Sequence, residues 1–123
     1  MTATVHVQAF HNVEPLAMLF GYEPGHRVRR AFTAQMPAAD PYDVCEAVFI
    51  LLNGGDLAAG RDQRAQEYRR RGERSLSKGD LVAISDSAHS RPVYYSVDSA
   101  GFTPLAAAPR ILGAPAEPAA SPR

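Results

Sequence analysis

The sequence predicts an α+β fold, in which a small, largely antiparallel sheet carries one main amphipathic helix packed on one face. Two observations predict it: several segments have the two-residue period of strands, and one apolar helix has clear boundaries. The 123 residues are enough for one domain with one hydrophobic core, which we expect to span residues 1–105. Residues 106–123 are rich in proline and alanine, and we expect this tail to be disordered.

Four segments are typical of strands, because apolar residues alternate with polar ones where one face of a sheet packs on a core. These segments are Thr4 to Phe10, His26 to Ala34, Leu81 to Asp86 and Val93 to Asp98. Between the first two, Pro15 to Phe20 has helical spacing. A strand from Leu16 to Tyr22 that turns at Pro24-Gly25 is the alternative for this segment.

The strongest helix signal runs from Pro41 to Asn53. Asp40 can accept hydrogen bonds from N–H groups of the first turn, and Pro41 occupies a position where a missing N–H costs nothing. Two glycines end the helix. Its apolar side chains form one broad stripe, and we expect Val48 and Phe49 to lie at the centre of the core.

Charge and composition exclude several classes of protein. Thirteen Lys and Arg balance thirteen Asp and Glu, so net charge does not draw the chain to nucleic acid or to an acidic membrane. No apolar run reaches the roughly 20 residues of a membrane span, and the N-terminal residues do not resemble a targeting leader. A single cysteine cannot form an intramolecular disulfide. We therefore expect a cytoplasmic protein with no membrane partner and no cofactor.

A cysteine-dependent enzyme is one alternative. Cys45 lies in the first half of the helix, where the helix dipole can lower the pKa of a thiol, and any of four histidines could approach it. However, Cys45 also falls within the apolar stripe, and a small buried thiol accounts for it fully. The histidines show no pairing that is typical of a metal site. We therefore predict no catalytic, cofactor-binding or metal-binding residues.

Two arginine clusters form the candidate binding surface. One lies in the strand that begins at His26, and the other in a polar segment, residues 55–73, that we expect to be partly ordered with a solvated helix from Asp62 to Arg71. If the fold brings the clusters together, a phosphate backbone or an acidic protein can bind there, and tyrosines such as Tyr68 and Tyr94 can stack on bases. The candidate partner-binding residues are Arg27, Arg29, Arg61, Arg64, Arg69, Arg70, Arg71, Arg74 and Tyr94. A merely solvated face is the alternative.

The segments from Arg74 to Ile84 and from Tyr94 to Phe102 resemble the YodL-like domain. The shared pattern is an apolar helix with asparagine at its end, here Asn53, a variable polar stretch, a Ser-Leu-Ser-x-Gly-Asp turn, a strand, and a Tyr-Tyr strand that closes on Gly-Phe. Lys78 departs from the apolar residue expected before the glycine. The resemblance implies an accessory, anti-defence or anti-restriction role in a phage or other mobile element, with near relatives in actinobacteria. It carries over no catalytic residue.

Turn chemistry explains the same motif without the family. Gly79 can adopt a positive φ angle and Asp80 can tie the turn, while an anion-binding nest is the functional alternative. We predict a non-enzymatic, protein-binding accessory protein of a bacterial mobile element, with a protein partner of unknown identity. A nucleic-acid-binding module that uses residues 61–74 is the first alternative, and a small cysteine-dependent enzyme is the second. A homodimer through an exposed edge strand is a further option.

Overall fold

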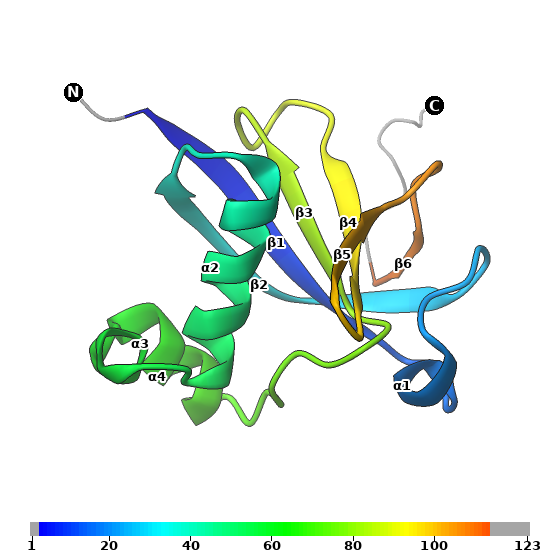
Figure 1. Ribbon diagram of the computed structural model, residues 1–123, viewed down its shortest axis with the longest axis horizontal. Helices are drawn as coiled ribbons and strands as arrows, with labels where there is room; N and C mark the ends of the chain where they lie inside the picture. The colour runs from blue at the N-terminus through cyan, green and yellow to red at the C-terminus, as the bar shows by residue number, and fades with distance from the viewer. Residues whose placement is uncertain (1–2, 114–123) are drawn as a thin grey trace.

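The computed structural model describes residues 3–113 and has an α+β architecture, in which a curled sheet is crossed on one face by a helix (Figure 1). The strands are β1 (Thr4–Asn12), β2 (Arg27–Pro37), β3 (Leu81–Ser85), β4 (Val93–Asp98), β5 (Gly101–Pro104) and β6 (Arg110–Leu112). The helices are α1 (Ala17–Phe20), α2 (Pro41–Asn53), α3 (Leu57–Arg61) and α4 (Gln63–Arg70). In Figure 1, α1 lies at the opposite end of the molecule from α3 and α4.

The strand order in the sheet is β5-β4-β3-β1-β2-β6. Four of the neighbouring pairs are antiparallel, but β6 runs parallel to β2. The sheet is therefore mixed, and the prediction of a largely antiparallel sheet missed β5 and β6. β6 lies inside the segment predicted to be disordered. The sequence did not indicate this strand, because its partner β2 is distant in the sequence and no local pattern reveals the pairing. Residues 114–123 of the predicted tail lie outside the described residues.

α2 covers one face of the sheet and contributes the main part of the core. Its boundaries are those predicted: Asp40 accepts a hydrogen bond from a first-turn N–H at 2.9 Å, and Gly54 ends the helix with φ of 66°. Val48 is fully buried, whereas Phe49 is partly buried and packs edge-on against Phe102, with ring centroids 6.3 Å apart. The predicted packing of helix on sheet is confirmed.

The polar segment after α2 is ordered, and the helix predicted from Asp62 to Arg71 is present as α4, but it packs on the core through two buried residues and is not simply solvated. α3 and α4 each begin at an aspartate, Asp56 or Asp62, whose side chain accepts a backbone hydrogen bond at 2.7 or 2.8 Å. Ala65 and Tyr68 of α4 are completely buried, and the Tyr68 ring meets Phe32 of β2 edge-on at 6.0 Å. One buried aromatic ring docks this charged helix, and Tyr68 is therefore not exposed for stacking on bases.

A second, smaller apolar cluster lies on the opposite face of the sheet, because its members alternate along the strands with residues that face α2. Its buried members are Phe10, Val28, Leu81 and Ala83. The partly buried side chains that pack against it are Tyr22, Tyr94, Leu105 and Ile111, so the segments after β5 and in β6 help to cover this face. The segment before β2 forms the short helix α1, so the alternative strand from Leu16 to Tyr22 is excluded.

The Ser-Leu-Ser-Lys-Gly-Asp turn is joined to the end of α2 by one side chain. Asn53 accepts a hydrogen bond from the Leu76 N–H at 2.8 Å and donates one to the Leu76 carbonyl oxygen at 3.0 Å. The amide thus pairs with Leu76 as a neighbouring strand would. Gly79 of the turn has φ of 94°, as the sequence predicted, and lies against the backbone of α1.

Asp80 completes this turn from a buried position, with 1% of its surface exposed. Its two oxygens accept hydrogen bonds at 2.8 Å from the N–H groups of Asn12 and Ser77, and they accept two more from the Arg74 guanidinium at 2.6 and 2.9 Å. Because the Ser77 N–H is already bound to Asp80, it is not available for an anion-binding nest. The motif is a structural entry into β3.

Candidate functional site: an arginine groove beside the edge of β2

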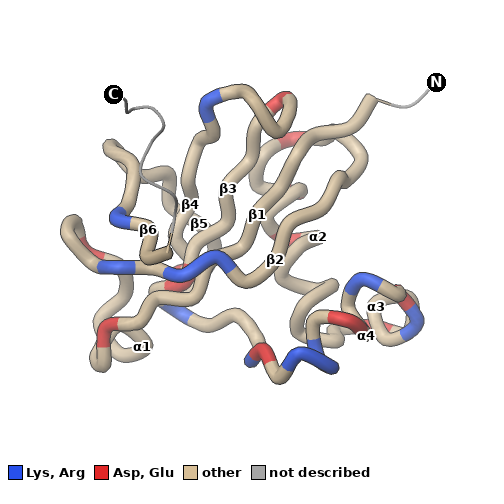
Figure 2. Tube along the Cα trace, turned by 180° about the vertical axis from the view of Figure 1, so that it is seen from behind, with Lys and Arg blue, Asp and Glu red and all other residues tan. Residues whose placement is uncertain are grey.

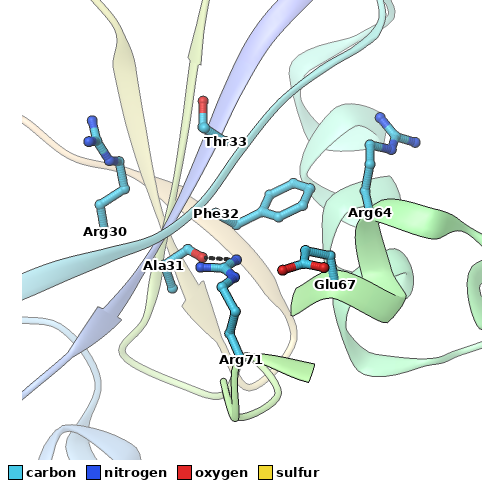
Figure 3. A pocket seen from close by; sticks show the side chains of 7 residues that line it. All are labelled: Arg30, Ala31, Phe32, Thr33, Arg64, Glu67 and Arg71. Atoms are coloured by element: carbon cyan, nitrogen blue, oxygen red, sulfur yellow. Dashed lines mark hydrogen bonds between the residues drawn. The ribbon is translucent and has the colours of Figure 1, made fainter. Parts of the chain in front are cut away.

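A groove with a volume of about 340 Å³ runs between β2 and α4 (Figure 3). Ligand pockets commonly have volumes of about 300–1,000 Å³, so this space is large enough for part of a partner molecule. We call it the arginine groove. Its lining residues are Arg30, Ala31, Phe32 and Thr33 of β2, and Arg64, Glu67 and Arg71 of α4 and the turn that follows it.

The charged wall of the groove is one face of α4. Arg64, Glu67 and Arg71 recur every three or four residues, so they lie above one another on a helical surface. The adjacent face carries Tyr68, whose burial against the core fixes the helix beside β2. The same buried ring lies 5.9 Å from the guanidinium of Arg71. The wall is therefore held in place by packing.

Two arginines of this wall bind the backbone of β2. The register between β1 and β2 shifts at a bulge, which leaves Ala31 without a partner residue in β1. Arg71 donates to the carbonyl oxygen of Ala31 at 3.0 Å, as Figure 3 shows. Arg64 donates to the carbonyl oxygen of Gln35 at 2.9 Å. These arginines hold neutral acceptors at the edge of the sheet.

The groove has a positive lining. Without Arg30, two arginines and one glutamate line it, which leaves an excess of one positive charge. Arg64 also pairs with Asp62 at 2.9 Å, and Glu67 pairs with Arg70 outside the lining. Arg30 points to the other side of β2 in Figure 3 and borders the groove. An anionic group of a ligand is the species that this lining favours.

The two predicted arginine clusters lie on one side of the molecule. Figure 2 shows the basic stretch of β2 facing the viewer and the basic end of α4 below it. Several of the predicted residues are nevertheless bound within the protein. The ion-pair distance is 2.9 Å for Arg27 with Glu14, 2.8 Å for Arg29 with Glu73, and 2.6 Å for Arg74 with Asp80.

The other predicted residues differ in their surroundings. Arg70 pairs with Glu67 on the surface of α4. Arg61 and Arg69 are exposed and have no ion-pair partner within residues 3–113. Tyr94 is partly buried in the second apolar cluster, with its ring 5.9 Å from that of Phe10. Of the nine predicted residues, only Arg64 and Arg71 line the groove.

A buried hydrogen-bond network that the sequence did not reveal lies at His11. The Nε2 atom of His11 is 2.8 Å from the Tyr68 hydroxyl and 3.0 Å from the Arg74 carbonyl oxygen. Arg29 lies 3.2 Å from Nδ1, and a guanidinium can only donate. The neutral ring therefore carries its proton on Nε2. Burial, together with the positive charge of Arg74, lowers the pKa of His11 below its ordinary value of 6.5.

The lowered pKa of His11 predicts a loss of stability in mild acid. The unfolded chain takes up a proton near pH 6.5 while the folded ring stays neutral, so the free energy of unfolding should fall as the pH falls from 6.5 to the lowered pKa. Urea unfolding of the wild type at pH 7.5 and 5.5 measures the fall. His11→Gln should reduce the difference between the two values. An unchanged difference in that variant would show that other groups cause it.

Cys45 does not have the properties of a catalytic nucleophile. It is completely buried in the core under α2, and burial raises the pKa of its thiol to about 12. Nucleophilic cysteines are partly exposed and have lowered pKa values, so the predicted buried thiol is confirmed. Within the described residues, no group of three metal-ligating side chains could hold a metal ion. No helix in the same part of the chain is long and apolar enough to cross a bilayer.

A second surface, formed by α1 and the residue before it, is apolar. Its large side chains are 58–67% exposed, although apolar residues of this size are usually buried. They are Leu16, Met18, Leu19 and Phe20. Contiguous apolar patches on a folded surface commonly mark contacts with other proteins. Helical spacing suggested α1, but nothing local in the sequence showed that its apolar side chains would face outward.

The comparisons with known proteins give no relative. No protein-family model matches the chain, and no curated protein or solved structure matches it significantly. The resemblance to the YodL-like domain therefore stays a prediction.

Proposed function

We propose that this chain is a protein-binding domain whose arginine groove receives an acidic segment of a partner protein. The observation that carries the proposal is the pair of guanidinium groups, from Arg64 and Arg71, that line a groove of net positive charge. Guanidinium groups bind carboxylates with paired, charge-assisted hydrogen bonds, which give both affinity and orientation. Arg64 already binds the Asp62 carboxylate, but the carbonyl oxygens of Gln35 and Ala31 that the two arginines also hold are neutral and weaker acceptors than a carboxylate.

A protein partner accounts for the surface better than nucleic acid does. The arginines outside the groove that could extend it into a track for a phosphate backbone, Arg27, Arg29, Arg70 and Arg74, are paired with acidic side chains. The exposed apolar side chains of α1 resemble a protein contact, and they have no role in phosphate binding.

The biological setting of this binding is part of the same proposal. The Ser-Leu-Ser-x-Gly-Asp turn and the Tyr-Tyr strand resemble YodL-like domains, which supports a role as a cytoplasmic accessory protein of a bacterial mobile element, with anti-defence or anti-restriction as the class of activity. In such a role the protein acts by occupying its partner, so it needs a recognition surface and no catalytic residue.

An anisotropy titration with two labelled probes tests the proposed function. The probes are a glutamate-rich peptide and a single-stranded oligonucleotide of similar length. The double variant Arg64→Gln/Arg71→Gln should weaken peptide binding at least about tenfold, because two charge-assisted hydrogen bonds are lost. The control Arg61→Gln/Arg69→Gln removes the same charge from exposed positions outside the groove and should change it less than about threefold.

The two probes separate the alternatives. Nucleic-acid binding depends on the number of phosphate contacts. If the surface binds nucleic acid, both double variants should weaken binding of the oligonucleotide to a similar degree, and added salt should weaken that binding steeply. That outcome, together with a peptide that does not bind, would replace the proposal with the nucleic-acid alternative. If the two double variants weaken binding of the peptide to the same degree, the groove is not the binding site.

A further inference from the structure

The edge of β2 beside the arginine groove is not paired with another strand. β1 occupies one side of β2 along its length, but β6 covers the other side only from Arg27 to Arg29. Within the described part of the chain, no strand lies beside residues 30–37 on that side. An unpaired edge of this length offers a row of backbone N–H and C=O groups to any extended chain that reaches it.

The backbone groups that face outward from this edge are identifiable. The carbonyl oxygen of Gln35 points away from β1, because it binds Arg64. Backbone groups of alternate residues point to the same side of a strand, so the N–H and C=O of Thr33 point outward as well. Ala31, at the bulge, directs its carbonyl oxygen outward to Arg71. Thr33 therefore lies between two arginine-bound carbonyl groups.

The two arginines occupy the hydrogen-bonding positions that a neighbouring strand would use. Each donates one hydrogen bond to an edge carbonyl group, as the N–H of a paired strand does. An incoming backbone can replace these bonds one for one, so pairing leaves no carbonyl group unsatisfied. This exchange frees the guanidinium group of Arg71 and the Nη1 group of Arg64, whose Nε and Nη2 atoms stay bound to Asp62, to bind carboxylates on the incoming chain.

We propose that the acidic partner segment binds as an added strand along residues 31–35 of β2, with two of its carboxylates on Arg64 and Arg71. This inference rests on the proposed function and gives the conformation and spacing of the ligand. Strand addition is an established way for an edge to bind an extended peptide. Residues 31 and 35 are four apart, a separation of about 13 Å along a strand, so the two carboxylates should also be four residues apart.

A second copy of this chain suits the edge less well than an acidic segment does. Pairing of two β2 edges would bring Arg64 and Arg71 of both copies together, and like charges across a strand pair are destabilising. An acidic strand reverses the sign of this interaction. The groove therefore discriminates between a partner and self-association by charge.

Three kinds of blocked seven-residue peptide, each made of valine and threonine with two glutamates, test the spacing and the backbone contact. The first has glutamates at its second and sixth positions, the second has them at the second and fifth, and the third is the first peptide with alternate backbone nitrogens methylated. Two N-methylated versions are made, one for each set of alternate nitrogens. We expect the second peptide to bind at least about tenfold more weakly, because its glutamates face opposite sides of the strand. We expect one of the methylated versions to lose binding.

Two measurements on the protein complete the test. Thr33→Pro removes an outward N–H and places a ring at the edge, and it should abolish binding of the first peptide. It leaves the backbone hydrogen bonds to β1 in place and removes only the contact of the Thr33 hydroxyl with His6. Hydrogen exchange of the wild type gives a second measurement that does not depend on the folding of this variant. The first peptide should slow exchange of the Thr33 and Gln35 amide protons at least about tenfold.

Each outcome decides between the proposals. If the first peptide binds and depends on Arg64 and Arg71, but the methylated versions bind equally well and exchange does not slow, strand addition is wrong and the proposed function stands. If no peptide binds, both are wrong. If sedimentation shows a dimer in the absence of peptide that Arg64→Glu strengthens, the edge serves self-association instead.

Discussion

Asp80→Asn should lower the free energy of unfolding by about 3 kcal/mol or more, the largest effect that we expect from a single polar substitution. Asparagine has the same size as aspartate, but an NH₂ group replaces one of the two carboxylate oxygens. This NH₂ group then faces hydrogen-bond donors. Each oxygen of Asp80 now accepts one backbone N–H and one N–H of Arg74. The substitution leaves a buried donor without an acceptor and the Arg74 charge without its partner.

Urea unfolding measures this loss, and the midpoint of thermal unfolding should fall by about 10 °C or more. Arg74 is partly exposed and can turn to water, which keeps the loss at the lower end of the range for buried ion pairs. Glu67→Gln breaks an exposed ion pair with Arg70 and should cost less than about 1 kcal/mol. A loss for Asp80→Asn as small as that of the control would show that the turn does not depend on this carboxylate.

The network around Asp80 explains the residues that carry the resemblance to YodL-like domains. Asn53 binds the backbone of Leu76, Gly79 allows the close approach of α1, and Asp80 joins the turn to β1. These contacts hold α2, α1 and β3 together, so the motif specifies an arrangement of elements. The proposed recognition surface lies elsewhere, on residues that the motif does not include.

Local signals predicted the elements whose boundaries depend on nearby residues. The residues from Asp40 to Gly54 contain an N-cap, a first-turn proline, an apolar stripe and a terminating glycine, and α2 begins and ends where they indicate. β4 has the predicted boundaries for the same reason, because its alternation is local. α1 was predicted as a helix, but its exposure depends on the rest of the fold.

Long-range contacts decided the features that the sequence did not show. The sequence of α4 predicts a charged, solvated helix, but burial of the Tyr68 ring holds the helix against the core. The surroundings of that ring come from β2 and the core, which are distant in the sequence. β6 pairs with a strand that is distant in the sequence, and it is only three residues long. A binding surface was predicted only for the case in which the fold brings the two arginine clusters together. The sequence did not indicate which arginines would be neutralised by ion pairs.

Gly79→Ala should lower the free energy of unfolding by about 2–5 kcal/mol through two separate costs. The backbone of Gly79 has φ of 94°, a conformation that costs a residue with a side chain about 1–2 kcal/mol. A Cβ atom there would also lie 2.7 Å from the carbonyl oxygen of Ala17 and 3.0 Å from its Cβ, so the backbone of α1 would have to move. Forcing an extra methyl group into a packed position costs about 1–3 kcal/mol more.

Gly25→Ala separates the two costs, because Gly25 has nearly the same φ, 93°, and an added Cβ would meet nothing within 4 Å. It should therefore show only the backbone cost of about 1–2 kcal/mol. The difference between the two variants measures the contact between the turn and α1. Limited proteolysis should also cut near α1 faster in Gly79→Ala than in Gly25→Ala, since only the first displaces that helix. Equal losses of stability in the two variants would mean that α1 moves away at little cost, and the exposed apolar surface that it carries would then be loosely held.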